Sequence, residues 1–173
     1  MSSNFYRGII IIKKFLGMFI NGVAMIFGIA MFLIALAPAV TQTITLPIVG
    51  TSVSHLSFYE LFQFVGMEEY AGFSALVIII VICLCLGIIF CSISSSISLF
   101  LRKKMANVAA FTAFIGSLNF LISGILMFFI VVVLGNRAST LTLGTGAICN
   151  GIIGILVAGT AFLAGLVDLK KIK

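Results

Sequence analysis

The chain alternates long apolar runs with short polar segments, and four of the runs are long enough to cross a lipid bilayer. They cover Phe15–Ala37, Ala71–Leu101, Met105–Leu134 and Leu143–Val167. A transmembrane helix needs roughly 20 consecutive apolar residues, whereas the strands of a membrane barrel give short segments of alternating polarity. The pattern therefore predicts an all-α integral membrane protein, a four-transmembrane-helix bundle that forms one domain over residues 1–173.

The composition agrees with lipid as the solvent of most of the chain. Of the 173 residues, 62% are hydrophobic and 8% are charged, and the mean hydropathy is +1.38. Soluble domains average about 25% charged residues, so this composition excludes a protein dispersed in water. The net charge of +6 does not indicate a nucleic-acid partner, because the basic residues lie in short clusters between the apolar runs.

The basic clusters predict the orientation of the chain. Only one of the ten Lys and Arg residues, Arg137, lies on the opposite side of the predicted membrane from the others. The other nine are Arg7, Lys13, Lys14, Arg102, Lys103, Lys104, Lys170, Lys171 and Lys173. Because Lys and Arg accumulate in cytoplasmic segments, both termini are predicted to be cytoplasmic, in a cell membrane. The closing KKIK also matches a K-K-x-x retrieval signal, which makes the endoplasmic reticulum the alternative.

The outer loop, residues 41–70, is longer than a simple connection needs. Its first part, TQTITLPIVGTSVS, is rich in Thr, Val and Ile and predicts an extended segment or a hairpin. Its second part, SFYELFQFVG, predicts a short interfacial helix. Ser57 and Glu60 have the S-x-x-E spacing of a capping box, and Gly66 is well placed to end the helix.

This short helix carries the candidate interaction residues of the outer loop. Four residues share a broad apolar arc on a helical projection: Phe58, Leu61, Phe62 and Val65. Such an arc either covers the chain's own helices as a lid or forms a docking patch for another membrane protein. A third interpretation makes the loop catalytic through His55 and Glu60.

Small residues recur at helical spacing in each apolar run, which is typical of close helix packing in lipid. The candidate packing residues are Gly28, Gly87, Gly116, Asn119, Gly151, Gly154 and Ala158. Asn119 falls near the middle of the third run, so its amide needs a hydrogen-bond partner there. It either joins two helices or lines a polar path for a small solute.

The residue types that usually carry chemistry are few and scattered. Four cysteines lie inside the predicted helices and form no C-x-x-C motif: Cys83, Cys85, Cys91 and Cys149. The single histidine belongs to no zinc motif, and the apolar runs contain no other ionisable residue, which proton-coupled transporters usually need. The sequence therefore predicts no metal, no cofactor and no catalytic residue.

These features favour a non-catalytic membrane protein, an accessory or scaffold subunit that binds partners in the bilayer or through its outer loop. The expected partners are membrane lipid and either another membrane protein or a second copy of the chain. One alternative is a small oligomeric channel, exporter or holin-like pore. Another is a membrane enzyme that acts on lipid.

The layout of four spans with a large first outer loop is similar in outline to that of claudin-like tetraspan proteins. The W…C…C signature of their loop is missing, because the chain has no Trp and its outer loop has no Cys. The resemblance implies a four-span architecture and carries no function across.

Overall fold

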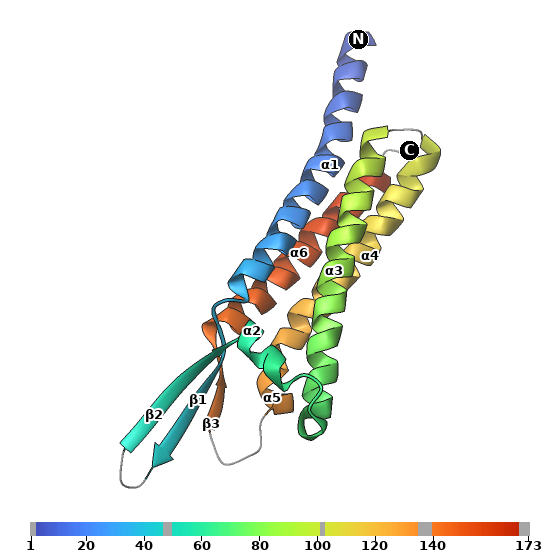
Figure 1. Cartoon of the computed structure of the whole chain (residues 1–173). Helices are drawn as coiled ribbons and strands as arrows, with labels where there is room; N and C mark the ends of the chain where they lie inside the picture. The colour runs from blue at the N-terminus through green and yellow to red at the C-terminus, as the bar shows by residue number, and fades with distance from the viewer. Residues whose placement is uncertain (1–2, 47–49, 101–102, 135–139, 170–173) are drawn as a thin grey trace. The chain divides into compact units, whose positions relative to one another are not determined.

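The computed structural model of the chain describes residues 3–46, 50–100, 103–134 and 140–169. Within these ranges, four helices are long and apolar enough to cross a membrane (Figure 1). They are α1 (Ser3–Ile34), α3 (Ala71–Phe100), α4 (Lys103–Phe128) and α6 (Thr145–Leu169). The prediction of four helices of transmembrane length is confirmed.

Shorter elements lie in two of the connections between these helices. The connection from α1 to α3 contains β1 (Pro38–Leu46), β2 (Gly50–Ser57), α2 (Phe58–Leu61) and the 3-10 turns η1 (Phe62–Phe64) and η2 (Glu68–Tyr70). The connection from α4 to α6 contains α5 (Ile130–Leu134) and β3 (Thr140–Leu143).

The strands add a small sheet to the predicted all-α fold class, in which the outer loop was expected to hold an extended segment or a hairpin. β1 and β2 pair over the segment that was expected to be extended, whereas β3 is not among the predicted elements. Because Thr140–Leu143 forms a strand that pairs with β1, the last long helix begins at Thr145 and not at Leu143. The third apolar run, residues 105–134, is likewise divided, into α4 and α5.

The three strands form one antiparallel sheet in the order β2-β1-β3. β1 pairs with β2 along its length, with an irregularity between Pro38 and Val40, and β3 pairs with Val40–Thr43. Side chains alternate between the two faces of a strand, and β-branched residues favour strands. The register places Thr41, Thr43, Thr51 and Thr142 on one face.

Very short turns join β1 and β3 to their neighbouring helices. β1 begins four residues after the end of α1, and α6 begins two residues after the end of β3. The two turns lie against each other, since the Gly144 amide donates to the Ala39 carbonyl at 2.8 Å. A Cβ on Gly146 would lie 2.5 Å from the Ala37 carbonyl oxygen, so this close approach requires glycine.

The chain divides into two compact units, each of which gathers segments from different parts of the sequence. The first unit comprises residues 1–29, 84–121 and 156–173, and its described elements are all helical. The second comprises residues 30–83 and 122–155 and contains the whole sheet, α2 and α5. The prediction of one domain over residues 1–173 does not distinguish these units.

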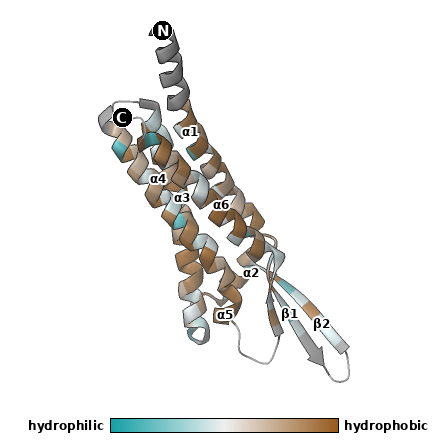
Figure 2. Cartoon of the chain, turned by 180° about the vertical axis from the view of Figure 1, so that it is seen from behind, coloured by the Kyte–Doolittle hydropathy of each residue, from teal (hydrophilic) through white to brown (hydrophobic). Residues whose placement is uncertain are grey.

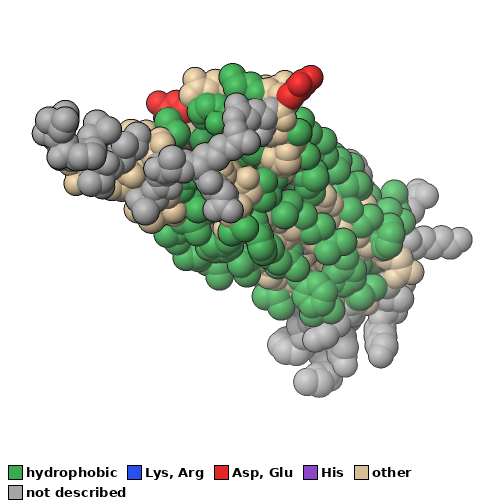
Figure 3. All heavy atoms as spheres, turned by 90° about the horizontal axis from the view of Figure 1, so that it is seen from below, with side chains coloured by type: hydrophobic (Ala, Val, Ile, Leu, Met, Phe, Trp, Pro, Cys, Tyr) green, Lys and Arg blue, Asp and Glu red, His purple; other side chains and the backbone are tan. Residues whose placement is uncertain are grey.

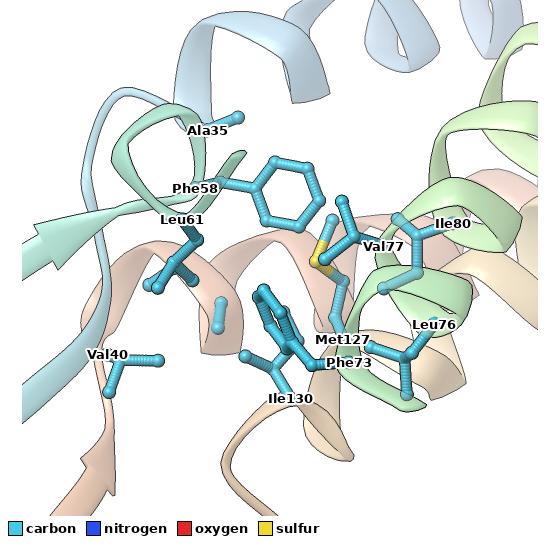
Figure 4. Packing of buried hydrophobic residues seen from close by; sticks show 12 residues of the cluster. Ala35, Val40, Phe58, Leu61, Phe73, Leu76, Val77, Ile80, Met127 and Ile130 are labelled. Carbon is cyan, nitrogen blue, oxygen red and sulfur yellow. The ribbon is translucent and has the colours of Figure 1, made fainter. Parts of the chain in front are cut away.

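A cluster of buried apolar residues joins the sheet and α2 to the helices within the second unit (Figure 4). Val40 of β1 and Leu61 of α2 have no exposed surface, and neither has Ile130 of α5. Phe73 of α3 is buried beside them. The strands and the short helix therefore share a core with the ends of the long helices.

Large apolar side chains also lie on the outside of the helices. Most residues of the helices are hydrophobic by the colouring of Figure 2, and hydrophobic side chains spread over the face seen in Figure 3. Leu33 of α1, Phe111 of α4 and Val132 of α5 are 68%, 65% and 70% exposed. Soluble monomers rarely expose apolar surface on this scale, whereas lipid tails are as apolar as leucine. The surface is that of a membrane protein.

Candidate functional site

Two of the predicted packing glycines make room for one aromatic ring in the first unit. Phe120 of α4 has no exposed surface, and its ring packs against Gly28 of α1 and Gly87 of α3. A Cβ would lie 2.7 Å from the ring at Gly28 and 3.1 Å from it at Gly87. The sequence pattern does not single out Phe120, which is one of 17 phenylalanines.

Gly116 of α4, also in the first unit, packs against α3. A Cβ at this position would lie 2.8 Å from the sulfur of Cys91 and 3.2 Å from the Gly87 carbonyl oxygen. Small residues of this kind let two helix backbones approach closely. Cys91 is buried, so it serves here as a small packing residue.

In the second unit, glycines bring α4 and α6 together. A Cβ on Gly154 would lie 2.8 Å from the Cα of Gly124, and a Cβ on Gly151 would lie 3.1 Å from the Gly124 carbonyl oxygen. Gly124 was not among the predicted packing residues, which include Gly116 on the same helix. The signal that could have found it is its own small size, which it shares with the predicted packing residues.

Asn119 and Ala158 take part in two different kinds of hydrogen bond. The side-chain amide of Asn119 donates to the Ile115 carbonyl at 2.9 Å, a bond within its own helix. The Ser117 hydroxyl donates to the Ala158 carbonyl at 2.7 Å, which joins α4 to α6 in the first unit. The connection between helices at this depth is therefore made by Ser117, the residue two positions before the predicted one.

A second polar contact joins three helices in the first unit. The side-chain amide of Asn21 in α1 donates to the Ser94 hydroxyl of α3 at 2.9 Å. The same hydroxyl donates to the Ala109 carbonyl of α4 at 2.7 Å. Asn21 and Ser94 are both fully buried. Within the described chain, the Asn21 side-chain carbonyl has no hydrogen-bond partner, so the amide is satisfied on its donor side only.

Asp168 is a buried carboxylate that the sequence analysis missed. It lies in α6, is 1% exposed, and accepts a hydrogen bond from the Ser98 hydroxyl of α3 at 2.9 Å. The predicted fourth run ends at Val167, so Asp168 was not counted within it. Because α6 continues to Leu169, the structure places an ionisable group inside the helix packing of the first unit.

The short helix α2 begins with the predicted capping box. The Ser57 amide donates to Oε2 of Glu60 at 2.6 Å, and the Glu60 amide donates to the Ser57 hydroxyl oxygen at 3.3 Å. The backbone hydrogen bond from Ser57, and then the one from its hydroxyl, hold the pKa of the Glu60 carboxyl below its ordinary value. Gly66 follows the helical turns with a positive φ of 92°.

The four arc residues of the outer loop separate into two groups. Phe58 and Leu61 are buried in the core of the second unit (Figure 4), and Val65 is half-buried against it. Phe62 is 39% exposed, as is its neighbour Tyr59 at 45%. The helix therefore covers its own core with one side and presents aromatic surface on the other.

The groups that a catalytic loop would use have separate partners. His55 is exposed, and its Nδ1 lies 3.1 Å from the Thr41 hydroxyl, whereas Glu60 binds Ser57. Among the described residues, no three His, Cys, Asp or Glu side chains lie close enough together to hold a metal ion. The four cysteines are free thiols on α3 and α6.

The arrangement is one of helix contacts, a short capped helix and an exposed sheet. No protein-family model matches the chain, and none of the curated proteins matches it.

Proposed function

We propose that the chain is an accessory or scaffold subunit of a membrane assembly, which acts by binding other proteins and not by catalysis. Its surroundings are lipid along the helices, and its partner is a membrane protein that contacts the helix surface or the exposed sheet. The exposed apolar side chains of the helices support lipid as their surroundings.

The observation that carries the proposal is that buried polar side chains form hydrogen bonds between helices. Asn21, Ser94 and Ser117 donate hydrogen bonds to neighbouring helices, and Ser98 donates to Asp168. Side chains used in this way join helices to one another, which favours a packed bundle over a path for a solute. The buried ring of Phe120 between Gly28 and Gly87 likewise favours dense packing in the first unit.

The proposal includes an orientation in the membrane. With the termini in the cytoplasm of a cell and the sheet outside, nine of the ten Lys and Arg residues lie on the cytoplasmic side. The sheet and α2 then face the compartment from which an extracytoplasmic partner approaches.

Purification of the tagged full-length chain from its native membrane in a mild detergent tests the proposal. We expect one heterologous membrane protein to co-purify in a fixed stoichiometry. The matched control is an unrelated four-helix membrane protein with the same tag, which should not retain that partner.

Two results would replace the proposal with another function. Self-oligomers without a heterologous partner, combined with ion or solute flux in liposomes, would identify a pore. An activity toward lipid that is lost in His55→Ala, with folding unchanged, would identify a membrane enzyme.

A further inference from the structure

The sheet leaves one edge without a neighbouring strand. β1 is the central strand, so β2 has β1 on one side and no described strand on the other (Figure 1). Residues Thr51, Ser52, Val53, Ser54 and His55 along this edge are all exposed. An edge strand presents unpaired amide and carbonyl groups, which can accept a further strand.

β2 lacks the features that normally block such pairing. Its sequence, GTSVSHLS, contains no Lys, Arg, Asp, Glu or Pro, although charged residues and proline are the usual means of protecting a sheet edge. The three acidic residues of this connection, Glu60, Glu68 and Glu69, come after the strand. The edge is therefore chemically open to the addition of an extended segment.

We propose that the segment that adds to this edge is β2 of a second copy of the chain, paired antiparallel about a two-fold axis. In such a pair, residues directly opposite each other point to the same face of the sheet. A two-fold axis perpendicular to the sheet therefore places one residue opposite its own copy. Val53 lies near the middle of β2 and is an apolar side chain with 53% of its surface exposed, so it is the residue at the axis.

This register repeats a contact that the chain already makes. Centring the pair on Val53 places His55 opposite Thr51 of the second copy, by counting two residues to each side. Within the chain, His55 already lies opposite a threonine, Thr41, with Nδ1 and Oγ1 3.1 Å apart. Ser52 falls opposite Ser54, and no like charges meet because the strand has none. An uncharged strand of small hydroxyl residues thus suits a copy of itself.

Self-pairing of this kind would join the two three-stranded sheets into one sheet of six strands. The inference rests on the proposed function in one respect only, that the sheet is a binding surface. It concerns contacts between copies, so it does not depend on which heterologous partner co-purifies.

Cysteine cross-linking in native membranes tests the register. Val53→Cys, in a chain whose four native cysteines are replaced by serine or alanine, should form a disulfide-linked dimer on mild oxidation. Mixed copies carrying Thr51→Cys and His55→Cys should also cross-link. Gln63→Cys, which is also exposed but lies outside the strand, is the matched control and should remain monomeric.

A charge-reversal pair gives a second readout that does not need cysteine. Val53→Lys places like charges opposite each other and should lower the dimer fraction severalfold, and so should Val53→Glu, whereas an equal mixture of the two should restore it. Val53→Thr keeps a β-branched, uncharged side chain and should dimerise like the unchanged protein.

The outcomes separate this inference from the proposed function. Absence of the Val53→Cys dimer, or equal cross-linking at Gln63→Cys, would overturn self-pairing even if a heterologous partner co-purifies. If Val53→Lys loses the dimer and mixing it with Val53→Glu does not restore it, self-pairing is also overturned. In that case the two Val53 positions do not lie opposite each other. A rescued dimer without any heterologous partner would uphold self-pairing and contradict the accessory-subunit proposal.

Discussion

At the scale of single residues, the helix contacts depend on positions where even a methyl group has no room. Gly154 meets the backbone of Gly124, which cannot move without moving its helix, whereas Gly28 meets the ring of Phe120. Sequence spacing finds the small residues, because their stripe is visible on each helix alone. It does not identify Phe120 or Gly124 as contact residues, because the residues that they pack against lie on other helices.

Gly154→Ala should destabilise the protein by about 1–3 kcal/mol, because the new Cβ would lie 2.8 Å from the Cα of Gly124. Gly159→Ala is the control in the same helix, where a Cβ meets nothing within 4 Å. Thermal unfolding in detergent measures both. Equal melting temperatures for the two variants would mean that α4 and α6 do not meet at Gly154.

Ser98→Ala should lower the free energy of unfolding by about 1–3 kcal/mol, because it removes a donor from the buried Asp168 carboxylate. Ser96→Ala is the matched control: Ser96 is exposed and donates to the Ser92 carbonyl of its own helix. Denaturant titration of both variants provides the comparison. A loss as large in Ser96→Ala would show that the effect comes from the helix and not from Asp168.

At the scale of elements, local signals identify α2 well and β3 poorly. The Ser57 and Glu60 spacing names the start of α2, because a capping box is formed by residues three apart in sequence. β3 has only four residues and directly precedes an apolar helix, so its Thr-Leu alternation is lost in the longer apolar run. Its strand structure comes from pairing with Val40–Thr43, nearly a hundred residues earlier.

The Glu60 cap should weaken in acid. The pKa of this carboxyl is lowered in the folded state from its ordinary value of 4.5, so its stabilising contribution is complete above that value. The contribution is lost as the pH falls through the lower, folded-state pKa. Hydrogen exchange of the α2 amides, corrected for intrinsic rates, should show protection falling with acidification, whereas Glu60→Gln, an uncharged capping-box residue, should show no such change.

The exposed side of α2 and η1 should lie in the membrane interface. Tyr59 rests on α1, since its hydroxyl donates to the Phe32 carbonyl at 2.9 Å, and Phe62 is exposed next to it. Aromatic side chains are enriched at this level of a bilayer. The chain has no Trp, so Phe62→Trp introduces a single fluorophore that brominated lipids should quench.

Thr51→Trp, at the far end of β2 from α2, is the control for this measurement and should be quenched much less. Quenching of equal size at both positions would show that the whole connection lies in lipid. Lack of quenching at Phe62→Trp would instead leave this surface free for a protein partner.

At the scale of the whole molecule, the sequence predicts the number and approximate limits of the long helices because each is a continuous apolar run. It does not predict the division into two units, since each unit collects segments that are distant in sequence. It also overlooks Asp168, because a carboxylate next to three terminal lysines resembles an ordinary helix end. The orientation remains a prediction from the distribution of Lys and Arg.

Thr51→Cys should react with a membrane-impermeant thiol reagent added to intact cells, and Lys103→Cys should react only after the cells are opened. The reason is the nine-to-one distribution of basic residues between the two sides. The unchanged chain, whose cysteines lie on α3 and α6, gives the background. Labelling of Lys103→Cys in intact cells would reverse the orientation.

The short turns between the sheet and the helices have a mechanical consequence. β1 is four residues from α1 and β3 is two residues from α6, and the Gly144 and Ala39 backbones tie these turns together. Flexible linkers would absorb a pull on the strands, but these turns have no slack to take up. A force applied to the sheet is therefore transmitted directly to the adjoining ends of α1 and α6.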